Sequence, residues 1–320
     1  MIIRLGYVAM TLNLKDASPS KTVTVATYNK IEDPEGKKYR LEKLTRANLQ
    51  NTLRILRYNL AHDIHVYRFT SKLVPLATHP LTAGWHYEDD FAEEFKEIGD
   101  FVKEHDFRVS AHPDHFTLIN SPSEKVFEDA LKDLEYHYRV YKAMGLEDKK
   151  YKLVLHVGGL YKNKEASIGR FIDRFKLLPD YIQDRIILEN DDKLFNAKDV
   201  LGICKTLKIP MVFDAHHYRC NNEGEKITPL LPLIFDTWKD EYFNPKIHLS
   251  SPKNHKQFRS HADKIEIDDC LNFIEVAKKV NDDFDIMLEA KDKDNALFDL
   301  MEKLKASGKV SIINQAAIEV

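Results

Sequence analysis

The chain has 320 residues, of which 43 % are hydrophobic and 31 % are charged. That length can bury a large core, and one eight-stranded barrel domain needs about 250 residues. The net charge of −3 gives no sign of general nucleic-acid binding, so a polyanion site must be local or must carry bound cations. No run of eighteen apolar residues occurs, and Cys204, Cys220 and Cys270 fit neither a disulfide framework nor a cysteine zinc site. We therefore expect a soluble protein of the reducing cytoplasm, with no membrane partner.

Eight short runs of β-branched or aromatic residues recur along the chain, and each precedes a segment with apolar residues at helical spacing. The runs predict strands at Ile2–Val8, His65–Thr70, Arg108–His112, Lys152–Val157, Arg185–Asn190, Met211–Asp214, Lys246–Leu249 and Asp285–Glu289. The clearest helices are predicted at Leu44–Ala61, Tyr87–Glu104 and Glu124–Met144, the last with Gly145 as its cap. Strands and helices that alternate at this spacing are typical of a parallel sheet.

Eight βα units favour a single (β/α)₈ barrel domain over residues 1–320, although an open doubly wound sheet has the same local pattern. The motifs G-x-G-x-x-G, G-x-x-x-x-G-K-[ST], G-x-S-x-G and H-E-x-x-H are absent. Dinucleotide-binding, P-loop, serine-hydrolase and zincin functions therefore lose their main support, and no nucleotide cofactor is expected. We expect the tail after Gly308 to be peripheral.

Side chains that can bind metal ions stand at the carboxyl ends of most predicted strands or in the loops that follow. They are His112, His156, Glu189, Asp214, His216, His217, Lys246, His248, His261 and Glu289. In a barrel these strand ends meet at one face, so residues far apart in sequence become neighbours. One histidine at a strand end is more often structural than a ligand. So many buried titratable groups together, however, are destabilising unless cations or hydrogen bonds compensate them.

We therefore predict a cluster of divalent metal ions, for which mixed imidazole and carboxylate ligands suit Mn²⁺, Zn²⁺ or Fe²⁺. Two or three such ions activate water, contact phosphoryl oxygens and stabilise a leaving oxyanion, which are the needs of phosphodiester hydrolysis. Sugar isomerisation on similar barrels needs fewer ligands. The number of candidates favours phosphoester chemistry over the alternative of a metal-dependent sugar isomerase or epimerase.

The motifs resemble those of the UV-damage endonuclease family along nearly the whole chain, from RLGY to LEAKDK. The most specific are YRFTSKLVPLATHP, the HP-x-x-F segment from His112 to Phe116, LENDD, FDAHH and PKIHLSS. The resemblance implies a TIM (β/α)₈ barrel of the endonuclease IV and xylose isomerase type, with a cluster usually described with manganese. It also implies cleavage of double-stranded DNA immediately 5′ to cyclobutane pyrimidine dimers and 6-4 photoproducts, leaving a 3′-hydroxyl and a 5′-phosphate.

Carried over residue by residue, the resemblance assigns metal ligation to eight side chains. They are His112, His156, Glu189, Asp214, His217, His248, His261 and Glu289. We expect Glu189, Lys246 and His248 to be catalytic. Because an ammonium group beside metal ions is electrostatically unfavourable, we expect Lys246 to be deprotonated or carboxylated, and a carboxylated Lys246 would be an anionic ligand.

The resemblance also implies a wedge, in which two side chains after the HP dipeptide enter the duplex while the lesion turns outward. Here these are His115, where relatives often carry Gln, and Phe116. A dimer stacks and pairs poorly, so extruding it costs less than extruding normal bases. Tyr7 is a candidate for the lesion pocket, and His79 is a candidate for either a structural role or a phosphate contact.

A basic loop follows the seventh predicted strand, in the segment SSPKNHKQFRSH. We assign its Lys253, Lys256 and Arg259 to DNA phosphates. Two further alternatives stay open, an abasic-site endonuclease of the endonuclease IV type and a DNA-binding module without catalysis. The leading prediction is a monomeric repair endonuclease that acts on DNA containing UV photoproducts at the nucleoid.

Overall fold

The computed structural model describes residues 1–320, and its strands close into a barrel. β1 (Ile2–Val8) pairs in parallel with both β2 (Val66–Phe69) and β8 (Phe284–Leu288), which joins the two ends of the sheet. Between them, in pairing order, lie β3 (Arg108–Ala111), β4 (Lys152–His156), β5 (Ile186–Glu189), β6 (Met211–Asp214) and β7 (Lys246–Leu249). The predicted TIM (β/α)₈ barrel is confirmed, and every predicted strand agrees with the observed one to within one residue at each end.

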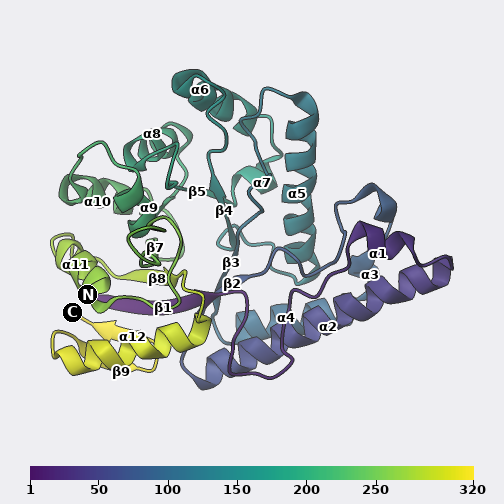
Figure 1. The fold of residues 1–320 in the computed structure, drawn as a ribbon, viewed down its shortest axis with the longest axis horizontal. Coiled ribbons are helices and arrows are strands. Elements are labelled where there is room, and N and C mark those ends of the chain that lie inside the picture. Colours follow the sequence, from purple (N-terminus) through teal and green to yellow (C-terminus); the bar gives the residue numbers. More distant parts are fainter.

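Helices follow most of the strands and cover the outside of the barrel (Figure 1). They are α1 (Val25–Asn29), α2 (Pro34–Ala61), the short 3₁₀ helix η1 (Pro80–Thr82), α3 (Tyr87–Asp90), α4 (Ala92–Glu104), α5 (Glu124–Ala143), α6 (Lys164–Phe175), α7 (Asp180–Gln183), α8 (Ala197–Leu207), α9 (Ala215–Cys220), α10 (Ile227–Asp236), α11 (Ile267–Ala277) and α12 (Lys293–Ser307). None of these helices is long and apolar enough to cross a membrane.

Two predicted helices differ from the observed ones. α2 begins ten residues earlier than predicted, at Pro34, because the Asp33 carboxylate caps its N-terminus by accepting from two backbone N–H groups. Figure 1 shows this first part of α2 reaching past the barrel, with α1 and α3 near its end. The segment predicted as one helix from Tyr87 is split into α3 and α4 at the buried Phe91, whose backbone leaves the helical region.

The tail after Gly308 is not peripheral, which corrects the expectation from the sequence. β9 (Ser311–Asn314) and β10 (Ala317–Glu319) form an antiparallel pair, and β10 pairs antiparallel with the first half of β1. The second half of β1 pairs with β2. The tail therefore supplies the hydrogen-bonding partner for the part of β1 that β2 does not reach, and Ala317 and Ile318 are buried.

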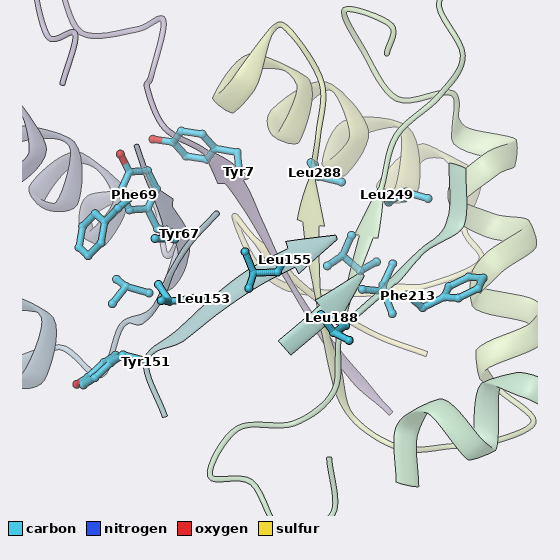
Figure 2. Close-up of a cluster of buried hydrophobic side chains, with 14 of the residues drawn as sticks. Tyr7, Tyr67, Phe69, Tyr151, Leu153, Leu155, Leu188, Phe213, Leu249 and Leu288 are labelled. Carbon is cyan, nitrogen blue, oxygen red and sulfur yellow. The ribbon is translucent and has the colours of Figure 1, made fainter. Parts of the chain in front are cut away.

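The strands carry apolar side chains on both faces, as expected for parallel strands covered by helices. Figure 2 shows Leu153 and Leu155 of β4, Leu188 of β5 and Leu249 of β7 in one buried cluster. At the amino ends of the strands, the buried Asp285 carboxylate of β8 accepts hydrogen bonds from Arg4 (2.7 and 2.8 Å) and Arg108 (2.6 Å). This end of the barrel is thus filled by a network of ion pairs. Loss of one partner would leave a buried charge unpaired.

Candidate metal centre

The predicted ligands lie at the carboxyl ends of the strands or in the loops that follow them. His156, Glu189 and Asp214 end β4, β5 and β6, while His112 and Glu289 directly follow β3 and β8. The strand register sets His156 beside Glu189. β5 and β6 are apolar up to these residues, whereas β3, β4 and β8 also carry Arg108, Lys152 and Asp285 nearer their amino ends.

The other three predicted ligands come from β7, from α9 and from the loop after β7. His248 lies within β7 and pairs in register with Asp214 of the neighbouring strand. Asp214 also caps α9, since its carboxylate accepts from the His217 backbone N–H at 2.6 Å, and this cap fixes His217 next to it. His261 is held in the loop after β7 by a β-bridge to Pro252.

Glu189 lies at the centre of four imidazole rings. Its Oε2 is 3.3 Å from His112 Nε2 and 3.8 Å from His156 Nε2. Its Oε1 is 2.9 Å from His248 Nδ1 and 3.4 Å from His217 Nδ1. The Glu189 side chain is 1 % exposed, so these contacts are made in a site almost free of water.

Glu289 extends the cluster on the other side. Its Oε1 is 3.4 Å from His248 Nδ1, and its Oε2 is 3.8 Å from His261 Nδ1. The Arg68 guanidinium of β2 forms an ion pair with the same carboxylate. Asp214 Oδ2 is 3.8 Å from His217 Nδ1. All eight predicted ligands are therefore joined through direct contacts into one cluster.

The cluster contains two overlapping groups whose ligand atoms lie within 4.8 Å of one another. They are His112, His156 and Glu189, and Glu189, Asp214, His248 and Glu289. Several buried atoms in them make no hydrogen bond of good geometry, although Glu189 Oε1 and His248 Nδ1 lie 2.9 Å apart: His156 Nδ1, Glu189 Oε1, Asp214 Oδ2 and both ring nitrogens of His248. Leaving such atoms unpaired is costly, whereas cations can use the carboxylate oxygens and imidazole nitrogens as ligands. The donor set thus fits a divalent metal ion.

Burial and neighbouring charges shift the pKa values of this cluster in opposite directions. Burial, which outweighs the attraction of His217, raises the pKa of Asp214 to about 8. For His217, burial lowers the pKa, but the carboxylates of Asp214 and Glu189 outweigh it and raise the pKa to about 11. Burial raises the pKa of Glu189, yet His248 and His156 hold it well below its usual range. Without cations, Asp214 and His217 therefore retain protons at neutral pH.

Lys246 lies deeper in the barrel than the other predicted catalytic residues. It is 2 % exposed, and its Nζ donates to Ser110 Oγ of β3 at 3.0 Å. Burial, reinforced by the positive charges of Arg108 and Arg68, lowers its pKa well below the usual range. This lowering favours the neutral amine, which is the deprotonated alternative considered from the sequence.

The residues predicted to contact DNA fall into three environments. His115 and Phe116 are exposed in the loop after β3, and the Phe116 side chain is 52 % exposed. His79 is half-buried and caps η1 by accepting from the Leu81 backbone N–H at 3.1 Å. Tyr7 is completely buried, with its hydroxyl donating to Asn59 Oδ1 at 2.5 Å (Figure 2). In this conformation Tyr7 presents no surface to a lesion.

The basic loop after β7 is exposed. Lys253, Lys256 and Arg259 all lie on its surface, and Arg259 Nε is 3.6 Å from Asp192 Oδ2 in the loop after β5. Because the loop begins at the carboxyl end of β7 and ends at His261, its cations stand on the same face as the candidate ligands.

Two residues of the centre escaped the sequence reasoning. Arg68 pairs with Glu289, and the only sequence signal was a charged residue inside an apolar strand. Asn190 binds the Asp214 backbone through both of its side-chain polar atoms, at 2.9 and 3.0 Å, and its carbonyl lies 2.9 Å from His217 Nδ1. Such side-chain-to-backbone support leaves no periodic pattern in a sequence.

Comparisons with known proteins point to one family. The chain matches the family model described as UV-endonuclease UvdE over residues 3–320. It is 43 % identical over 319 residues to a UV DNA damage endonuclease of Bacillus cereus (strain ATCC 10987 / NRS 248), and the match covers 100 % of both chains. The crystal structure of SacUVDE superposes with a TM-score of 0.83 at 34 % identity, covering 96 % of this chain and 99 % of that one.

A more distant similarity concerns the fold alone. The crystal structure of endonuclease IV from Thermus thermophilus superposes with a TM-score of 0.55 at 12 % identity, covering 95 % of this chain and 99 % of that one. The barrel is therefore shared with a second nuclease, but at this identity the likeness carries no assignment of residues.

The pKa values predict that metal affinity rises with pH. Asp214 and His217 hold protons in the absence of cations, and each must release its proton to become a ligand, so higher pH favours binding. Calorimetric titration with Mn²⁺ should show about tenfold tighter binding per pH unit between about pH 6 and about pH 8 for each proton released. An Asp214→Asn variant should bind more weakly and show a shallower pH slope. Equal wild-type affinity across this range would contradict the assignment.

Proposed function

The chain belongs to the UV-endonuclease UvdE family, and we propose that it cuts double-stranded DNA immediately 5′ to cyclobutane pyrimidine dimers and 6-4 photoproducts. The observation that carries the proposal is the buried cluster around Glu189 and Glu289, whose unpartnered atoms fit divalent cations. The proposed reaction is metal-dependent hydrolysis of the phosphodiester, with a 3′-hydroxyl and a 5′-phosphate as products. We further propose that the enzyme acts as a monomer at the nucleoid, since one chain supplies all eight ligands.

The proposed cofactor is a cluster of two or three Mn²⁺ ions. The two overlapping ligand groups support more than one ion, and Glu189 belongs to both, which suits a bridging carboxylate. Mixed nitrogen and oxygen ligands are compatible with Mn²⁺. When bound, such cations polarise phosphoryl oxygens, lower the pKa of water and stabilise the leaving oxygen.

The chain's own residues hold in place the carboxylates that would bind the cations. Glu189 is held by four imidazoles, so its carboxylate has little freedom to rotate away. Arg68 offsets the charge of Glu289 and stands at the wall of the site. His248, with no exposed surface, links the two carboxylates and excludes water between them.

Lys246 is proposed to carry a carboxyl group in the active protein. A neutral amine is the form that adds CO₂, and the buried Lys246 has its pKa lowered well below the usual range. The added carboxylate would turn a residue near Glu189 into an anionic ligand. Intact-mass measurement of native protein purified in bicarbonate should show one added carboxyl group, and a Lys246→Arg variant should not show it. An unmodified mass in protein that still cuts DNA would refute this part of the proposal.

Lesion recognition is proposed to depend on the exposed loop after β3. His115 and Phe116 project from it with their rings in an edge-on arrangement, 5.8 Å apart. An exposed Phe can fill the space that an extruded dimer leaves, and damaged steps open at lower cost than normal ones. Lys253, Lys256 and Arg259 are proposed to hold the phosphates, with His79 as a further candidate for such a contact.

The reaction is tested with an end-labelled duplex that carries one thymine dimer, incubated with protein and Mn²⁺. We expect one cut directly 5′ to the dimer, with far weaker cutting of undamaged DNA and of a duplex with an abasic site. Glu189→Gln should lower the rate at least about 100-fold, because the carboxylate shared by both candidate ligand groups is lost, while thermal unfolding stays cooperative.

Glu302→Gln, on the exposed surface of α12, is the matched control and should cut at the wild-type rate. Strong cutting at abasic sites with none at dimers would replace the proposal with an abasic-site endonuclease. Undiminished turnover by Glu189→Gln would remove the assigned centre.

Phe116→Ala tests the wedge. Loss of the ring should reduce cutting at a dimer about tenfold or more, because base–aromatic contacts of this kind are worth about 1–3 kcal/mol. Metal affinity should not change, since Phe116 belongs to neither candidate ligand group. Single-turnover rates on damaged DNA, compared with Tyr242→Ala as a control at another exposed aromatic, give the measurement. A Phe116→Ala enzyme with unchanged rate and lesion preference would exclude the role.

A further inference from the structure

We infer that Phe258 is a second stacking platform, which holds an unstacked base on the side of the metal centre opposite Phe116. The ligand is a nucleobase that has left the duplex. The inference rests on the proposed function, because it concerns the DNA that the centre cuts.

The ring of Phe258 lies close to the cluster and is open to solvent. It is 39 % exposed, and its centroid is 5.8 Å from that of His216. His216 has no exposed surface, and its ring lies 5.6 Å from that of the ligand His261 and 6.4 Å from that of the ligand His217. Phe258 is thus separated from two proposed ligands by one buried imidazole, which supports the ring from behind and leaves part of it free.

Backbone contacts hold the loop that carries Phe258 in place. The Pro252–His261 bridge closes its base, and the Lys253 backbone N–H donates to the Ser260 carbonyl at 2.7 Å. Asn254 Oδ1 accepts from two backbone N–H groups within the loop, at 3.0 and 2.8 Å. A platform fixed before binding loses little entropy when a base docks on it.

Basic residues neighbour Phe258 along the chain. Lys253, Lys256 and Arg259 are exposed within five residues of Phe258 along the chain. Aromatic side chains interleaved with Lys and Arg are typical of surfaces that bind single-stranded nucleic acid, where the cations follow the phosphates and the rings stack on bases. Phosphate contacts alone give no reason for a large apolar ring at this position.

The barrel sets Phe258 across the mouth from Phe116. Phe116 follows β3 and Phe258 follows β7. In the closed order of eight strands, three strands separate β3 from β7 along either path. Two exposed phenyl rings therefore flank the centre from opposite sides. An intact duplex keeps its base faces covered, so a base that stacks on Phe258 must have left the stack, as extrusion of the lesion would bring about.

The test measures binding and cutting of a dimer-containing duplex by full-length wild-type protein, Phe258→Ala, Phe258→Tyr and Tyr242→Ala. Tyr242 is exposed beside the amino ends of the strands and serves as the control. We expect Phe258→Ala to raise the Kd about tenfold, whereas Phe258→Tyr, which keeps a stacking ring, and Tyr242→Ala stay within about twofold of wild type. The slope of log Kd against log salt should be unchanged in Phe258→Ala, because no phosphate contact is lost.

A second readout locates the base. 2-Aminopurine, placed at single positions beside the dimer, should change its fluorescence on binding at one position in wild type, and this change should be lost in Phe258→Ala. Wild-type affinity in Phe258→Ala, an equal loss in Phe258→Tyr, or a reduced salt slope would each overturn the inference. A wild-type protein that does not cut dimer DNA overturns the proposed function and this inference with it, whereas cutting by wild type with no effect of Phe258→Ala overturns this inference alone.

Discussion

Charge buried at the carboxyl ends of the strands is the constraint on which the rest of the structure depends. Glu189, Asp214 and His248 have almost no exposed surface, and several of their polar atoms have no partner within the protein. Such a group of residues is unfavourable by itself, because removing these charged and polar groups from water costs more free energy than their incomplete contacts with one another recover. A closed barrel with a continuous apolar core can supply the free energy that keeps these side chains in place.

Buried charges are paired differently at the two ends of the barrel. At the amino ends, Asp285 is fully paired with Arg4 and Arg108, so that network needs nothing from outside the chain. At the carboxyl ends, the carboxylates and imidazoles lie near one another with hydrogen-bonding capacity left over. A complete network serves stability, whereas an incomplete one keeps donor atoms free for ligands. The contrast supports the proposal that the chemistry of this UV-damage endonuclease takes place at the end where pairing is unfinished.

Much of this could be predicted from the sequence, because strand ends and ligand types follow local patterns. The strands ending at Val8, Asp214 and Leu249 have the same bounds in the prediction and in the structure, and a change from apolar to polar residues marks the ends at Asp214 and Leu249. The same rule places most of the candidate ligands at the strand ends, whereas the choice of eight among them comes from the resemblance to the family. Arg68 could not be found this way, because its role comes from an ion pair with a residue 221 positions away. The burial of Tyr7 depends on how α2 packs against β1, through Asn59, which no local pattern records.

The strand order also constrains how the chain can fold. β1 is the first strand, yet its neighbours include β8 and β10, and Arg4 reaches an aspartate 281 residues later. Contacts between segments so distant in sequence form slowly, since a long loop must close first. During synthesis β1 therefore emerges from the ribosome long before two of its partners exist, and its exposed edge needs protection until then. The face of the barrel that carries the candidate metal centre is therefore complete only after the last strands have been synthesised and have joined the sheet.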